Sequence, residues 1–157
     1  MNNLDILYPK LSDYPSPKRL YEDLNIDIGI IGIGSARLVI QDPNNKKHIL
    51  KLGVGNGIQQ NKNEIKVWNI SKKRNVSDIL LPIIEYDKNH RWIKMPKVNT
   101  QFGLDKYVGP DSERIHLKLK ENNIDLHEIE TCIYHQEPMA FDYGALEAIR
   151  PVKNFNN

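Results

Sequence analysis

The sequence predicts an α+β fold in which one helix packs on a five-stranded antiparallel sheet. Three strand-like stretches fill the first 53 residues, a helical apolar pattern follows, and two further short strands come after it. The chain has 157 residues, of which 39% are hydrophobic and 27% charged, as expected of a globular domain. We therefore expect a single domain over residues 1–157. The sheet and helix occupy residues 1–98, and a reduced C-terminal part occupies residues 99–157.

Proline, glycine and alternating apolar residues predict the first elements. Residues 1–15 predict an irregular lead-in, after which Ser16 and Pro17 begin a short helix. Residues 26–41, IDIGIIGIGSARLVIQ, predict two strands around a glycine turn. The turn sequence DPNNKK follows, and residues 48–53 predict a third strand. These strands form an antiparallel meander.

The middle of the chain changes from strand to helix and back. Residues 58–72 predict a helix, because Ile65 and Trp68 fall near one helical face. Residues 81–86 and 91–96 predict two short strands joined by a polar turn. The order of three strands, one helix and two strands therefore predicts the sheet and its packed helix.

The last third of the chain predicts shorter elements. A connector over residues 96–110 precedes a helix that ends near Asn122, although the apolar alternation of this stretch also fits a strand. Residues 123–146 predict two short strands around a turn at residues 135–138. The final residues, RPVKNFNN, predict a frayed tail.

Composition and charge exclude several classes of partner. The net charge of +2 gives no electrostatic footprint for nucleic acid or for an anionic membrane. No segment approaches 18 apolar residues, and the N-terminus lacks the pattern of a signal peptide. Cys132 is the single cysteine, so an internal disulfide is excluded, and we expect it to be a buried apolar residue. We expect a cytoplasmic protein that contacts neither nucleic acid nor membrane.

A lysine and a glutamate stand out as candidate site residues. Lys51 lies in the middle of the apolar strand HILKLG, and a charge that faces a core requires a carboxylate or an anionic ligand. Glu64 borders the apolar face of the following helix and is the candidate carboxylate. In the alternative interpretation, Lys51 reaches solvent from an edge strand and Glu64 pairs with Lys62 or Lys66.

Two further motifs accompany this pair. The stretch IGIGSARLVI places Gly32 and Gly34 at a hairpin tip, where glycines let the backbone approach an anion, although a plain hairpin turn explains them equally. The late stretches DLHEIE and FDYG bring further acidic residues. The order of glycine loop, strand lysine, helix glutamate and Asp-aromatic-Gly resembles the protein-kinase-like fold, and in particular small kinase-like proteins of archaea or viruses.

The resemblance implies a nucleotide site in the first part of the chain. In that family a glycine loop covers the phosphates of ATP, and Gly32 and Gly34 match two of its glycines, whereas Arg37 replaces the third. The resemblance also implies that Val39 packs against the base and that Met95 closes the back of the pocket. A core methionine is the plainer interpretation of Met95.

The resemblance also implies roles for the charged residues. Lys51 would hold the α- and β-phosphates and would itself be held by Glu64. Asp125 would accept the proton of the substrate hydroxyl, as the catalytic base. Glu130, in place of the usual asparagine, and Asp142 of the Asp-Tyr-Gly motif would bind Mg²⁺. In the alternative interpretation, Asp125 caps a helix or forms a turn, and Asp-Tyr-Gly is one more turn.

The sequence therefore predicts a minimal, truncated kinase-like domain that binds ATP and Mg²⁺. Such a domain either transfers phosphate or is a degenerate pseudokinase, since the chain ends soon after Asp-Tyr-Gly and two motif positions are replaced. A second hypothesis is a non-catalytic module of viral or mobile-element origin, which uses the same scaffold to bind a protein partner. A third is an unrelated α+β domain in which the motifs are coincidence, and Lys51 and Glu64 on opposite surfaces would establish it.

Overall fold

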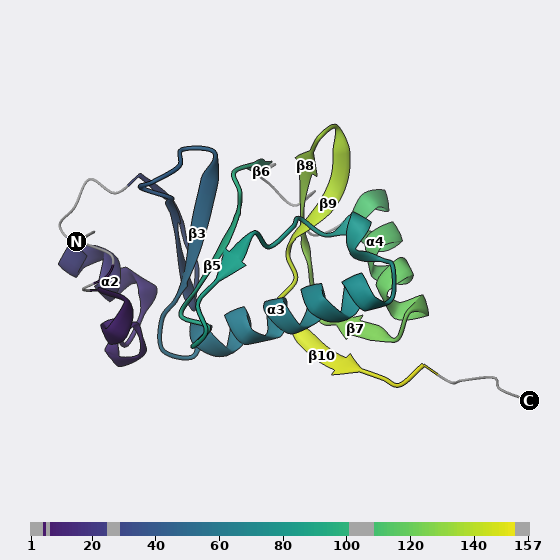
Figure 1. The fold of residues 1–157 in the computed structure, drawn as a ribbon, viewed down its shortest axis with the longest axis horizontal. Coiled ribbons are helices and arrows are strands. Elements are labelled where there is room, and N and C mark those ends of the chain that lie inside the picture. Colours follow the sequence, from purple (N-terminus) through teal and green to yellow (C-terminus); the bar gives the residue numbers. More distant parts are fainter. Residues whose placement is uncertain (1–4, 6, 25–28, 101–108, 153–157) are drawn as a thin grey trace, which may run out of the picture. The chain divides into compact units, whose positions relative to one another are not determined.

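The computed structural model describes residues 5, 7–24, 29–100 and 109–152 (Figure 1). The start of the predicted hairpin, most of the predicted connector and most of the predicted tail lie outside these residues. The chain separates into two compact units, which are described separately below. Unit one comprises residues 1–62 and 82–97, and unit two comprises residues 63–81 and 98–157.

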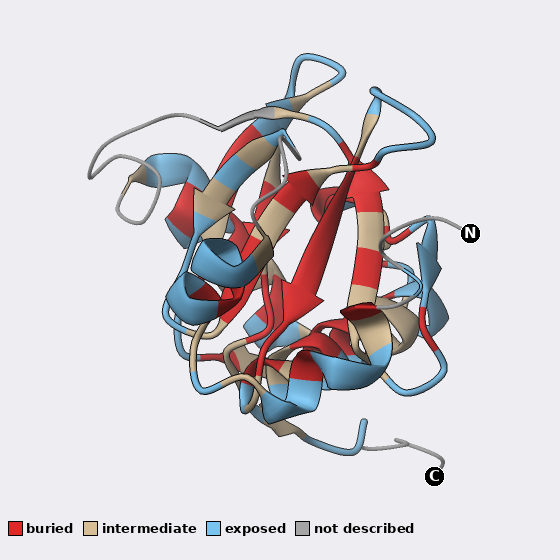
Figure 2. Cartoon of the chain, turned by 90° about the vertical axis from the view of Figure 1, so that its left-hand side faces the viewer, coloured by how far each residue is buried: buried red, intermediate tan, exposed pale blue. Residues whose placement is uncertain are grey.

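Unit one contains the predicted five-stranded antiparallel sheet, which confirms the α+β fold class. The strands lie in the order β1-β2-β3-β5-β4, so β3 is at the centre, and it is buried along nearly its whole length (Figure 2). Their bounds are β1 (Ile30–Ile33), β2 (Arg37–Gln41), β3 (His48–Gly53), β4 (Glu85–Tyr86) and β5 (Trp92–Pro96).

Strand β4 is shorter than the predicted strand over residues 81–86. The backbone N–H of Leu81 donates to the carbonyl of Ala140 at 2.9 Å, in unit two, and Pro82 has no N–H to donate. Leu81 and Pro82 therefore do not pair within the five-stranded sheet. Only Glu85 and Tyr86 pair with β5.

The register of the sheet sorts the candidate residues onto one face. Lys51 pairs with Val39 of β2 and with Ile93 of β5, and Ile49 pairs with Met95. Because successive strand residues point to opposite faces, these five residues share one face of the sheet. The predicted pocket residues Val39, Lys51 and Met95 therefore lie together.

The opposite face of the sheet carries a hydrophobic core that is completed by the N-terminal segment. This segment forms the 3₁₀ helix η1 (Tyr8–Asp13) and the helix α2 (Pro17–Leu24). The prediction of an irregular lead-in is therefore wrong over η1, where the buried Leu11 joins the core. The predicted helix after Ser16 is confirmed. The core comprises Leu7, Leu11, Leu20, Leu38, Ile40, Leu50, Leu52 and Val54.

Helix α3 (Gly57–Lys73) confirms the predicted helix within one residue at each end. Helix α4 (Pro110–Glu121), in unit two, decides between the two interpretations of that stretch. Ile115 and Leu119, one helical turn apart, are buried, whereas Leu117 between them is 58% exposed, which is a helical period. Among the described residues, no helix combines the length and apolar character needed to cross a bilayer.

The other elements of unit two include two small antiparallel sheets that the sequence predicts only in part. The turn at His135 and Gln136, both with positive φ, confirms the predicted hairpin of β8 and β9. The pairings of β7 with β10 and of β6 with β8 were not predicted. The bounds are η2 (Ser77–Ile79), β6 (Asn99–Thr100), β7 (Ile124–Leu126), β8 (Glu130–Tyr134), β9 (Glu137–Asp142) and β10 (Leu146–Ile149).

An ion pair closes the turn between β4 and β5. The Asp87 carboxylate accepts hydrogen bonds from Nε and Nη2 of Arg91, at 2.7 and 2.8 Å. Its Oδ2 also accepts from the backbone N–H groups of Asn89 and Arg91, at 3.1 and 3.2 Å. The hydrogen bonds from the Arg91 side chain, followed by those from the backbone, lower the pKa of Asp87 below its ordinary value of 3.8.

The ion pair between Asp87 and Arg91 predicts that the protein loses stability in acid. The unfolded state takes up the proton of Asp87 near pH 3.8, before the folded state does, so the stabilisation is complete above that pH. It is lost as the pH falls through the lower pKa of the folded state. We expect urea unfolding to show that Asp87→Asn loses less stability between pH 7 and pH 3 than the wild type. Equal losses in the two proteins would contradict this.

Candidate functional site

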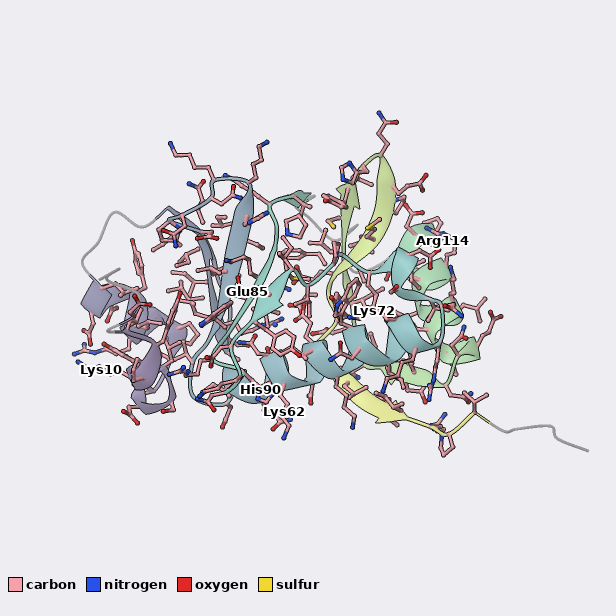
Figure 3. All side chains as sticks on the ribbon, viewed as in Figure 1. Lys10, Lys62, Lys72, Glu85, His90 and Arg114 are labelled. Atoms are coloured by element: carbon pink, nitrogen blue, oxygen red, sulfur yellow. The ribbon has the colours of Figure 1, made fainter. Side chains whose placement is uncertain are left out.

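Both members of the predicted lysine–glutamate pair are buried. Lys51 is 1% exposed on the central strand, so it does not reach solvent from an edge strand. Glu64 of α3 is 0% exposed, and neither side chain lacks an interaction partner. Lys62, which projects outward from α3 in Figure 3, and Lys66 are both exposed and make no ion pair with a described residue. The alternative in which Lys51 reaches solvent and Glu64 pairs with Lys62 or Lys66 is therefore wrong.

A buried asparagine, which sequence reasoning missed, fixes the start of α3 beside Lys51. The Nδ2 group of Asn61 donates to the backbone carbonyl of Lys51 at 3.3 Å. It also donates to that of His90 at 3.0 Å, in the turn between β4 and β5 (Figure 3). Its Oδ1 accepts from Nη1 of Arg37 at 3.3 Å. One feature of the sequence could have indicated that Asn61 is buried: it lies one helical turn before the apolar Ile65.

Arg37, which stands where the family has its third glycine, has a structural role here. Its side chain is buried, with 5% exposure, and its guanidinium donates to Asn61. It lies two positions before Val39 on β2, so it shares the sheet face of Lys51. A second cation therefore lies on the face that carries the predicted pocket residues.

The glycines differ in how far the backbone requires them. A Cβ atom at Gly32 would meet no atom within 4 Å, whereas one at Gly34 would lie 3.3 Å from the carbonyl oxygen of Arg37. A Cβ atom at Gly57 would overlap the carbonyl oxygen of Ala36 and lie 2.7 Å from its carbon. The fold therefore requires Gly57 and leaves open space at Gly32.

The two predicted metal ligands face each other in unit two. Glu130 and Asp142 are register partners on the antiparallel strands β8 and β9. Directly opposed residues on regular antiparallel strands have their Cβ atoms about 4.5–5.5 Å apart. A register shift follows this pair, between Glu130 and Thr131. Each side chain has an interaction partner in the structure, and Gly144 N–H approaches Oδ1 of Asp142 at 3.5 Å.

This pair of carboxylates suits Mg²⁺ that is bound together with a phosphate. Mg²⁺ commonly takes one or two carboxylates and completes its octahedron with substrate phosphates and water. Within the part of the chain that the structure describes, no cluster of three or more histidine, cysteine or acidic residues could hold a metal ion. The described residues therefore offer two acidic side chains here, fewer than a metal centre built from protein ligands alone commonly has.

Two hydrogen bonds hold the Asp-Tyr-Gly segment within unit two. The hydroxyl of Tyr143, which is fully buried, donates to the carbonyl of Leu81 at 2.8 Å. The side chain of Asn63 on α3 donates to the carbonyl of Gly144 at 3.3 Å. The tyrosine that replaces the usual phenylalanine thus has a polar partner, and the two residues that follow Asp142 are both anchored.

The Tyr143 hydroxyl predicts a measurable loss of stability on its removal. Tyr143→Phe keeps the ring but leaves a buried carbonyl without this donor. We expect the free energy of unfolding to fall by about 1–3 kcal/mol in urea titrations. An unchanged stability would show that the hydrogen bond contributes nothing. Tyr21→Phe, at an exposed position on α2, is the matched control and should change nothing.

Asp125, the predicted catalytic base, lies in strand β7 and is neither a helix cap nor a turn residue. Its register partner on β10 is Ala148. Oδ2 of Asp125 lies 2.6 Å from Nη1 of Arg150, and the side chain is 16% exposed. Its carboxylate is therefore engaged by a guanidinium.

Comparison with known proteins adds no family. No protein-family model matches the chain, and no curated protein matches it either.

Proposed function

We propose that the protein binds ATP together with Mg²⁺, as a minimal kinase-like domain. The observation that supports this best is the burial of Lys51 on the sheet face that also carries Val39 and Met95. A buried ammonium group is stable only with an acidic partner, an anionic ligand or both. In this proposal the ammonium group of Lys51 binds the phosphates of ATP, and the carboxylate of Glu64 orients that ammonium group.

The remaining residues of unit one would bind the nucleotide. Gly32 lies in β1 opposite Val39 and has open space on its Cβ side, and Gly34 lies in the turn between β1 and β2. The N–H of Gly34 already donates to the carbonyl of Arg37 at 2.8 Å, so other backbone N–H groups of the turn would bind phosphate oxygens, as those of glycine-rich loops do. Val39 and Met95 would present apolar surface to the base.

In unit two, Asp142 and Glu130 would hold the metal. Mg²⁺ would neutralise phosphate charge when it is bound. The hydrogen bonds of Tyr143 and Asn63 would keep the Asp142 segment in place.

Binding is the core of this proposal. Phosphate transfer with Asp125 as base would additionally require the Arg150 guanidinium to leave that carboxylate. A cytoplasmic location, where ATP and Mg²⁺ are available, belongs to the same proposal.

Calorimetric titration of the full chain with ATP tests the proposal. We expect binding that strengthens at least tenfold when Mg²⁺ is present, and Asp142→Asn to lose this enhancement. Asp111→Asn, at an exposed position on α4, is the matched control and should keep it. If millimolar ATP with Mg²⁺ gives no binding heat at two temperatures, the nucleotide proposal is wrong. The non-catalytic interaction module would then be the better hypothesis.

A further inference from the structure

Unit two contains a cavity with an apolar floor. Its volume is about 530 Å³. One side is formed by α4, and the other by β7 and the residues that follow it. Clefts that bind ligands commonly have about 300–1,000 Å³. Leu119, Ile124 and Ile129 line it and are nearly fully buried, whereas Leu117 lies at its edge with 58% exposure. Of these four side chains, only Leu117 therefore presents much accessible apolar surface.

The rim of this cavity is acidic, although the whole chain has a net charge of +2. Lys120 is the single lysine or arginine among the lining residues. Burial lowers the pKa of His116, so this lining imidazole is neutral at neutral pH. The lining carboxylates are Glu113, Asp125, Glu128 and Glu147.

The four carboxylates differ in what already binds them. Asp125 is paired with Arg150, and Glu147 is 3.2 Å from Nδ1 of His127. The side chains of Glu113 and Glu128 have no ion pair or hydrogen bond with any residue that the structure describes. The carboxylate of Asp125 therefore already binds the guanidinium of Arg150. The carboxylates of Glu113 and Glu128, on separate elements, are available for further cations.

We propose that this cavity docks a basic peptide segment in which arginine or lysine alternates with a large apolar residue. The apolar side chains of the peptide would pack on Leu117 at the mouth of the cavity, and the cations would pair with Glu113 and Glu128. The combination of an apolar centre and a charged rim is typical of protein interfaces. Charge complementarity of this kind sets specificity and the rate of association. The proposal does not depend on nucleotide binding.

Fluorescence anisotropy with a labelled peptide that alternates arginine and leucine tests this proposal on the full chain without ATP. The comparison peptide has citrulline for arginine, which keeps the shape and removes the charge. We expect a Kd below about 100 μM for the arginine peptide and binding about tenfold weaker for the citrulline peptide. Binding should also weaken as salt is raised, since exposed charges are screened.

A pair of variants locates the binding. Glu113→Gln with Glu128→Gln should weaken binding of the arginine peptide about tenfold. Glu121→Gln with Glu137→Gln removes two exposed carboxylates that do not line the cavity, and it should leave binding unchanged. No binding of the arginine peptide, equal binding of the citrulline peptide, or equal weakening by both double variants would overturn the proposal.

Discussion

Gly57→Ala should unfold the protein or reduce its stability by several kcal/mol, whereas Gly32→Ala should leave stability nearly unchanged. A Cβ atom at position 57 would overlap the carbonyl of Ala36, a backbone group that cannot move aside without breaking its hydrogen bond from Val54 N–H at 3.1 Å. The methyl group at position 32 would point into open space. Strain from overpacking costs about 1–3 kcal/mol even where side chains can adjust, so a backbone overlap costs more.

Circular dichroism and urea unfolding of the two alanine variants measure this difference. Gly32→Ala also provides a folded protein in which the proposed phosphate contact is altered. We expect it to bind ATP more weakly than the wild type, because the added methyl group restricts the approach of the backbone to an anion. A stable Gly57→Ala protein would contradict the described connection between β3 and α3.

Lys51→Met should abolish nucleotide binding and also lower the free energy of unfolding by about 3–5 kcal/mol, if Glu64 is its partner. The loss arises because a buried carboxylate is left without its opposite charge. Lys51→Met combined with Glu64→Gln removes both charges, and we expect it to recover most of the stability without recovering binding. Urea unfolding of the two single variants and the double variant forms the cycle that measures the coupling.

The outcome of this cycle separates two interpretations. Non-additive losses show that Lys51 and Glu64 interact, as the proposal requires. Additive losses would show that each buried charge has a different partner, and the kinase-like assignment of Glu64 would be wrong. Lys62→Met with Glu64→Gln is the matched control, since Lys62 is exposed and unpaired among the described residues.

The sheet was predictable from the sequence because its signals are local. Alternating apolar residues and the turn DPNNKK define β2 and β3, and the apolar period defines α3. The elements that were missed depend on distant partners. Leu11 makes η1 part of the core only because the sheet supplies the other side, and Leu81 leaves β4 because Ala140 lies within reach.

The candidate site was predictable in part for the same reason. A lysine within an apolar strand and a glutamate beside an apolar helix face indicated that both would be buried, and they are. The roles of Asn61 and Asn63 could not be predicted, because an asparagine in a helix does not reveal which distant carbonyls it meets. Those carbonyls belong to Lys51, His90 and Gly144.

Urea unfolding of the wild-type chain with and without Mg·ATP decides whether the buried lysine belongs to a nucleotide site. A ligand that binds only the folded state stabilises it by about 2.7 kcal/mol at a hundred times its Kd. We expect a gain of this size with saturating Mg·ATP and none with Lys51→Met combined with Glu64→Gln. An unfolding curve of the wild type that does not shift in millimolar Mg·ATP would contradict the proposed function.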